Sequence, residues 1–154
     1  MKIDSNHYGE LSLEQWHARV VDGEQLPITI SIESNGMRPL IRPEIDKITI
    51  MPKEHDPKVG EIVLFPSAYL HEANTYTIHR VQRIRGWQMK TMGDNCSKPD
   101  RWMATNQVWG VVTRIERGKW TIRPNDKKWI CIGCCWMLLY PLRRLLSGIY
   151  RMFR

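Results

Sequence analysis

The sequence predicts a mainly β protein, with a curled antiparallel sheet or partly open β-barrel, a short N-terminal helix and a C-terminal amphipathic helix. Three observations lead to this prediction. Short apolar runs with strand-like patterning recur from residue 26 onward, glycines stand between several of them, and unbalanced basic residues gather at the C-terminal end. Repeated short strands joined by tight turns are typical of small sheets that curl or close.

Residues 1–25 form an N-terminal segment that contains one predicted helix. Ser12 is suited to the N-cap position, Leu13 and Trp16 begin an apolar pattern at helical spacing, and Gly23 marks the stop. We expect this helix to pack against the sheet.

Residues 26–124 contain the predicted sheet. We expect strands at about 27–33, 47–51, 61–66, 75–84, 87–92, 107–117 and 119–123. Arg85-Gly86 and Gly118 stand between runs that follow each other closely, so they predict tight hairpins. Trp102 and Trp109 could line a groove, although ordinary packing of both rings is the commoner outcome.

The segment Ser34-Asn35-Gly36-Met37-Arg38-Pro39 connects the first two predicted strands. Irregular connections at a sheet edge often carry function. Glycine and proline between strands are also ordinary turn residues, so this segment alone identifies no site.

Further motifs follow in order along the chain. They are Asp46-Lys47-Ile48, Gly60-Glu61-Ile62-Val63-Leu64-Phe65, Ile78-His79-Arg80-Val81, Met92-Gly93-Asp94-Asn95 and Val108-Trp109-Gly110-Val111-Val112. In this order and spacing, roughly residues 28 to 117 resemble the signal peptidase I and SOS-repressor self-cleavage superfamily of serine peptidases. The His-Arg-Val form is closest to members that use a Ser-His pair. The resemblance implies a β-rich fold and peptide-bond hydrolysis.

The same resemblance assigns roles to residues on the later strands. His79 is the candidate base, since imidazole titrates near neutrality. Asp94 is the candidate residue that holds the imidazole in the useful tautomer, and Asp100 is a second candidate for that role. Arg80 is expected to neutralise a neighbouring carboxylate or to anchor its strand.

The position of the nucleophilic serine is occupied by Gly36, which has no side chain to attack a carbonyl. Met37 and Pro39, in the same motif, are candidate substrate-binding residues, and backbone N–H groups around Gly36 are candidate oxyanion donors. Three explanations of Gly36 stay open: a natural pseudo-enzyme, a replacement of the serine, or a nucleophile at Ser34. Ser34 is the weakest of them, because two residues along a strand shift a side chain by roughly 6–7 Å.

Two functions follow from these residues. The first is a signal-peptidase-like serine endopeptidase domain that acts on leader or signal peptides and is inactive as written. The second is a non-catalytic module that binds an extended peptide or a partner protein by strand addition. A self-cleaving repressor is disfavoured, because about 25 residues before the sheet are too few for a helix-turn-helix domain.

Composition limits the partners and cofactors. The chain has 154 residues and a net charge of +7, of which +6 falls in residues 127–154. A nucleic-acid binder more often spreads its basic residues over the folded domain, so we expect no nucleic acid. Cys131, Cys134 and Cys135 form a C-x-x-C-C pattern without the further ligands that zinc needs, so we expect no metal and no cofactor.

Residues 125–154 form a basic C-terminal tail. Residues 129–140 carry no charge but are too few to span a bilayer, and Pro141 interrupts them. The apolar residues of 142–154 recur on one helical face, with arginines mostly elsewhere, as in interfacial helices. The tail therefore predicts either contact with an anionic membrane surface or a helix docked on the sheet. With the polar start at residues 1–10, it favours an intracellular protein, peripheral on the membrane.

Overall fold

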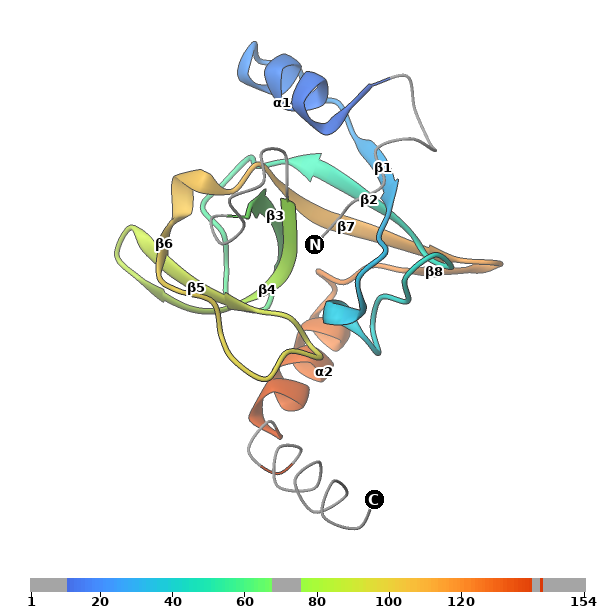
Figure 1. Ribbon diagram of the computed structural model, residues 1–154, viewed down its shortest axis with the longest axis vertical. Helices are drawn as coiled ribbons and strands as arrows, with labels where there is room; N and C mark the ends of the chain where they lie inside the picture. The colour runs from blue at the N-terminus through green and yellow to red at the C-terminus, as the bar shows by residue number, and fades with distance from the viewer. Residues whose placement is uncertain (1–10, 68–75, 140–141, 143–154) are drawn as a thin grey trace.

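The computed structural model of the protein describes residues 11–67, 76–139 and 142. Within these residues the fold is mainly β: eight strands form one sheet, and two α-helices lie at opposite ends of it (Figure 1). The predicted fold class is confirmed.

The strands are β1 (Ile28–Ser31), β2 (Lys47–Pro52), β3 (Ile62–Pro66), β4 (Tyr76–Arg85), β5 (Gln88–Met92), β6 (Met103–Ala104), β7 (Gly110–Arg117) and β8 (Trp120–Ile122). The helices are α1 (Leu13–Val21) and α2 (Lys127–Leu138), with two short 3-10 helices, η1 (Asn35–Met37) and η2 (Thr105–Gln107). All seven predicted strands are present. The short β6 was not predicted. β7 begins at Gly110, later than expected, because residue 107 belongs to η2 and residues 108 and 109 connect η2 to the strand.

The sheet is antiparallel throughout and follows the order β1-β2-β7-β3-β4-β5-β6, with β8 paired to β7. β1 and β6 stand at the two ends of this order, so the sheet is curled but open (Figure 1). Gly86 and Gly118, both with φ of 56°, join β4 to β5 and β7 to β8. This is the left-handed conformation that tight hairpin turns require, so both predicted hairpins are confirmed.

Two hydrophobic clusters fill the two faces of the central strands. The larger cluster includes Ile78 of β4 together with residues of α1 and β1, and the smaller one includes Val81 and the β3 residues Val63 and Phe65. Because successive side chains on a strand point to opposite faces, His79 shares the face of Val81, and Arg80 shares the face of Ile78. This alternation decides which residues can meet at the candidate site.

α1 closes the larger cluster. Ser12 caps the helix and forms a capping box with Gln15, as the N-cap prediction requires. Trp16 is 1% exposed and its Nε1 donates to the Leu26 carbonyl at 2.8 Å. The helix is thereby tied to the residues that precede β1.

α2 packs against the sheet with its small residue Gly133 over the Arg80 side chain. A Cβ on Gly133 would lie 2.5 Å from Arg80 Cζ, so only glycine allows this approach. Trp136 Nε1 donates to the Asp94 carbonyl at 2.8 Å. Residues 127–138 of the predicted tail are therefore a docked helix, while residues 143–154 lie outside the described part of the chain.

Candidate functional site

Gly36 lies in η1, directly after β1. The Ser34 side chain caps this short helix, and its Oγ accepts the Gly36 N–H at 3.1 Å. That N–H is thus already engaged within the segment. Gly36 is not among the glycines with positive φ, so its backbone conformation is open to other residues.

The structure brings Gly36 and His79 together. A Cβ placed on Gly36 would lie 3.5 Å from His79 Nε2 and 3.4 Å from Ser34 Oγ. These are ordinary van der Waals distances, so a small side chain would fit at this position. A hydroxyl on that Cβ would come within reach of the imidazole, which is the geometry that a nucleophile and its base need.

The imidazole of His79 is held from its other side by Asp100. His79 Nδ1 and Asp100 Oδ2 are 2.6 Å apart, with the two side chains only 13% and 15% exposed. Thr91 Oγ1 donates to the same carboxylate oxygen at 2.5 Å. Because Asp100 occupies Nδ1, Nε2 is turned toward Gly36.

Asp94 has a different partner, which corrects the role expected for it. Arg80 donates to both carboxylate oxygens of Asp94, at 2.9 and 2.7 Å, and to the Gly60 carbonyl at 2.8 Å. Arg80 and His79 point to opposite faces of β4, so the carboxylate that pairs with Arg80 does not hold the imidazole. The second candidate, Asp100, makes that contact, and Arg80 neutralises a carboxylate as expected.

The loop after β5 closes the site beside Gly36. Asn95 N donates to the Gly36 carbonyl at 2.8 Å, and Cys96 N donates to the Gly93 carbonyl at 2.9 Å. A Cβ on Gly93 would lie 2.5 Å from Gly36 O and 2.8 Å from His79 Nε2, so glycine is required here by close approach.

This loop also places a thiol at the imidazole, which sequence reasoning missed. Cys96 Sγ lies 3.8 Å from His79 Nε2 and 4.0 Å from the Gly36 carbonyl oxygen. The sequence does place Cys96 directly after the Gly-Asp-Asn motif. That position alone does not show that the turn folds back and brings the thiol to His79.

The electrostatics of the site favour a charged imidazole. Burial disfavours the cation, but the hydrogen bonds and negative charges of Asp100 and Cys96 outweigh it and raise the pKa of His79 to about 9. At neutral pH His79 is therefore an imidazolium, with both ring nitrogens protonated, and it can donate a proton. It becomes a free base only at alkaline pH.

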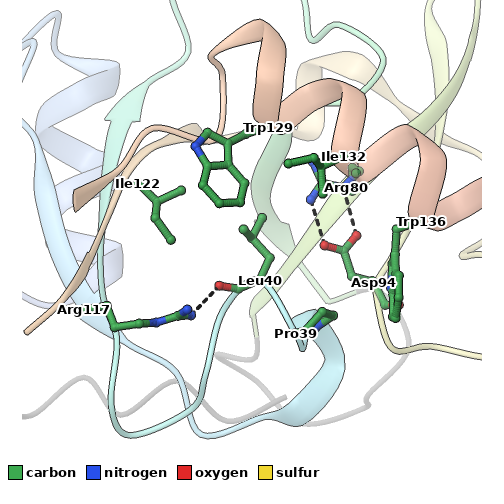
Figure 2. A pocket seen from close by; sticks show the side chains of 10 residues that line it. Pro39, Leu40, Arg80, Asp94, Arg117, Ile122, Trp129, Ile132 and Trp136 are labelled. Atoms are coloured by element: carbon green, nitrogen blue, oxygen red, sulfur yellow. Dashed lines mark hydrogen bonds and ion pairs between the residues drawn. The ribbon is translucent and has the colours of Figure 1, made fainter. Parts of the chain in front are cut away.

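Met37 and Pro39 lie on the other side of this segment. Met37 has 0% of its surface exposed and belongs to the larger hydrophobic cluster, so it is a core residue and not the substrate contact expected. Pro39 is exposed and lines a cavity of about 250 Å³ beneath α2. Figure 2 shows this cavity, with the Arg80–Asp94 ion pair on one wall and Leu40, Ile122 and Trp129 around it.

A second hollow, a groove of about 360 Å³, lies at the β5–β6 end of the sheet. Trp87 and Trp102 line it, with 70% and 41% of their surfaces exposed. Phe65 lines it too, and its ring packs edge-on against the His79 ring at 6.4 Å between centroids. The groove therefore adjoins the imidazole across a single ring. Trp109, by contrast, packs on Tyr76.

Among the described residues, no group of three or more His, Cys, Asp or Glu side chains has metal-binding geometry. In the same part of the chain, no helix is both long and apolar enough to cross a membrane. Comparisons with protein-family models, with curated proteins and with solved structures found no match to this chain.

Proposed function

We propose that this chain is a signal-peptidase-like domain that receives an extended leader or signal peptide, with Gly36 in the position of the serine nucleophile. The observation that carries the proposal is the alignment of three groups. His79 Nδ1 is bound to Asp100, and Nε2 faces the position that a Cβ on Gly36 would occupy, at 3.5 Å. A base held by a carboxylate and aimed at a nucleophile position is the arrangement of serine acyl-transfer sites.

The chain as written lacks the serine hydroxyl at position 36, so this position cannot perform serine chemistry. Removing one member of a catalytic unit usually costs most of its rate. The base and its carboxylate remain in hydrogen-bond geometry, and the backbone conformation at Gly36 is compatible with serine. The proposal therefore predicts that the missing group can be restored.

The substrate would lie in the groove beside Phe65 and against the edge of the sheet. β6 is paired only with β5 in the described sheet, so its outer edge is available for a further strand. Exposed Trp87 and Trp102 offer flat apolar surface next to that edge. Strand addition supplies main-chain hydrogen bonds, and side-chain pockets supply specificity. These features equally support the second candidate, a module that binds an extended peptide without cleaving it.

The test is the Gly36→Ser variant, exposed to a fluorophosphonate probe that reacts with activated serines. We expect labelling at residue 36 that is absent from the parent chain and at least about 100-fold slower when His79→Ala is added, since general-base catalysis contributes typically 10²–10⁴-fold. Labelling should accelerate between pH 7 and pH 9.5, because His79 must lose its proton to act as a base.

The parent chain is the matched control, because it retains Ser34. Labelling of Ser34 by the probe in the unmodified chain would show that Ser34, and not position 36, is the nucleophile. A folded Gly36→Ser protein that takes no probe and cleaves no leader peptide, but binds such a peptide, would favour the binding module. Reactivity that survives His79→Ala would show that His79 is not the base.

We further propose that the C-terminal segment meets an anionic membrane surface. α2 and the residues after it expose Ile132, Leu138, Leu139 and Leu142, and residues 127–154 carry six basic and no acidic residues. Basic residues near an anionic bilayer contribute about 1 kcal/mol each, less as salt rises.

Co-sedimentation with phosphatidylserine vesicles tests this proposal. Truncation after residue 142 removes four arginines and leaves α2 in place, so binding should fall by at least tenfold. Neutral phosphatidylcholine vesicles are the control. Binding that is equal on both vesicle types, or unchanged by the truncation, would contradict an electrostatic membrane contact.

A further inference from the structure

The candidate site contains a second possible nucleophile, the thiol of Cys96, which has no role in the serine-type chemistry proposed above. Cys96 Sγ is 3.8 Å from His79 Nε2 and would be 3.7 Å from a Cβ on Gly36. The thiol thus stands on the same side of the imidazole as the missing serine hydroxyl. Asp100 holds the opposite ring nitrogen at 2.6 Å. Cysteine, histidine and aspartate are therefore arranged in series.

Two glycines create the space that the thiol occupies. Gly36 lacks the side chain that would share this space, and a Cβ on Gly93 would lie 2.6 Å from Cys96 Sγ. The loop is fixed by the bond from Asn95 N to the Gly36 carbonyl and by its own turn. The position of Sγ therefore follows from backbone contacts.

We propose that Cys96 is the nucleophile of this site, assisted by His79 and Asp100, and that it forms a thioester with the acyl group of a bound peptide. This inference rests on the proposed peptide-binding site, and it changes the class of chemistry from serine to cysteine.

The charge state of the imidazole suits a thiol better than a hydroxyl. With its pKa raised to about 9, His79 is an imidazolium at neutral pH, and an imidazolium beside a thiol stabilises the thiolate. The thiolate is the reactive form of cysteine, whereas serine needs a neutral base to remove its proton. Asp100 and Cys96 are the titratable groups that face this imidazole.

The reaction balances with water as the only co-reactant. The reacting form is the ion pair in which the thiol proton already lies on His79 Nε2. The Cys96 Sγ thiolate bonds to the carbonyl carbon, and the carbonyl π electrons move onto oxygen. Collapse of this intermediate breaks the C–N bond, and Nε2 gives its proton to the departing amine. Water then attacks the thioester, losing a proton to Nε2. The C–S bond breaks, which releases the acid and restores the Cys96 thiolate beside the His79 imidazolium.

The other cysteines provide an internal control. Cys131 and Cys135 are exposed on α2, and Cys134 is half-buried there. Trypsin separates the two groups: residues 91–101 hold Cys96 alone, because Pro99 protects the bond after Lys98, and residues 129–143 hold the other three. A site-resolved alkylation rate can therefore be measured in the unmodified full chain.

The first arm of the test is alkylation by iodoacetamide at pH 6.5. Although Cys96 is less exposed than Cys131, we expect it to react at least tenfold faster, because its Sγ lies 3.8 Å from the His79 imidazole, and a positively charged neighbour favours the reactive form of a cysteine. The Asp100→Asn variant should lose most of this advantage while Cys131 keeps its rate. A Cys96 rate at or below that of Cys131 in the folded parent chain would overturn the proposal.

The second arm measures acyl transfer with p-nitrophenyl acetate. We expect a burst of about one p-nitrophenolate per chain, absent in Cys96→Ala and slowed at least tenfold in Asp100→Asn. A burst that persists in Cys96→Ala would assign the nucleophile elsewhere.

Together with a peptide-binding assay and the fluorophosphonate labelling, these two measurements test the Cys96 nucleophile and the proposed peptide-binding site independently. Fast Cys96 acylation in a chain that binds no leader peptide would overturn the peptide-binding proposal and retain the cysteine nucleophile. Slow Cys96 chemistry, with fluorophosphonate labelling of Gly36→Ser intact, would overturn the cysteine and retain the serine-type site.

Discussion

Two adjacent residues of β4, His79 and Arg80, have different roles because their side chains lie on opposite faces of the sheet. His79 points to the face that carries Gly36 and Asp100, and Arg80 points to the face covered by α2. Each residue has its own aspartate, so a basic neighbour does not compete for the carboxylate that holds the imidazole. Two adjacent positions thus serve the candidate site and the structural core separately.

Gly93 is the residue whose size matters most to this arrangement. In Gly93→Ala the new Cβ would lie 2.5 Å from the Gly36 carbonyl oxygen. Because this oxygen belongs to the backbone, it cannot relieve the clash by changing rotamer as a flexible side chain can. We expect the free energy of unfolding to fall by about 1–3 kcal/mol, as for other overpacked positions. We also expect rapid Cys96 alkylation to be lost.

Chemical denaturation with site-resolved alkylation checks both effects. Asn95→Ala is the matched control, because Asn95 is exposed in the same loop and its side chain makes only a 3.3 Å bond to the Asn35 carbonyl. Equal stability of Gly93→Ala and the parent chain would mean that the loop does not pack against Gly36 as described.

At the scale of elements, α2 stabilises the site from behind. It covers the Arg80–Asp94 pair, whose side chains are 1% and 2% exposed, and Trp136 binds the Asp94 carbonyl. Asp94 precedes Cys96 by two residues, so the helix supports the loop that carries the thiol. Breaking a buried ion pair by removing one partner typically costs about 3–5 kcal/mol, so the Arg80–Asp94 pair must stay matched beneath this helix.

Gly133→Ala tests the docking of α2. Alanine favours a helix over glycine by about 1 kcal/mol, so a free helix would gain stability. Here the new Cβ would lie 2.5–2.8 Å from guanidinium atoms of Arg80 that are held by three hydrogen bonds. We therefore expect a loss of about 1–3 kcal/mol in the free energy of unfolding.

Cys131→Ala, at an exposed position of the same helix, should change stability by less than about 0.5 kcal/mol. A stabilised Gly133→Ala protein would show that α2 does not rest on Arg80. In that case the whole segment after residue 126 would be free to act as a tail.

For the whole molecule, the His79 charge links stability to pH. The pKa of His79 is raised from 6.5 in the unfolded chain to about 9 in the fold, because Asp100 and Cys96 favour the cation more than burial disfavours it. The folded state therefore binds the proton more tightly. Its contribution is complete below about pH 6.5 and is lost as pH rises through 9.

The rise in the His79 pKa from 6.5 to about 9 corresponds to about 3 kcal/mol of unfolding free energy, so urea unfolding should show a decline of up to that size between pH 6.5 and pH 9.5. In Asp100→Asn the curve should be flatter, because the carboxylate that favours the cation is gone. A parent chain whose unfolding free energy is constant over this range would contradict a raised His79 pKa.

The sequence predicted the strands, both hairpins and the approach of Gly36 to His79, because strand periodicity, turn glycines and motif order are local or sequential signals. It favoured Asp94 over Asp100 as the partner of the imidazole, which was wrong, since that choice depends on which face of β4 each loop residue reaches. Met37 turned inward because η1 redirects the segment, and Cys96 reached His79 through a turn that apolar patterning does not describe. The missed contacts all depend on loop geometry.

The state of the His79 imidazole is the most direct measure of the site, because the serine-type proposal and the cysteine proposal both depend on its contact with Asp100. A nuclear magnetic resonance titration of the His79 ring in the folded parent chain should give an apparent pKa of about 9. In Asp100→Asn the His79 pKa should fall well below that value, since burial still disfavours the cation and the carboxylate that favoured it is gone. A parent-chain pKa near 6.5 that is unchanged by Asp100→Asn would contradict the proposed site.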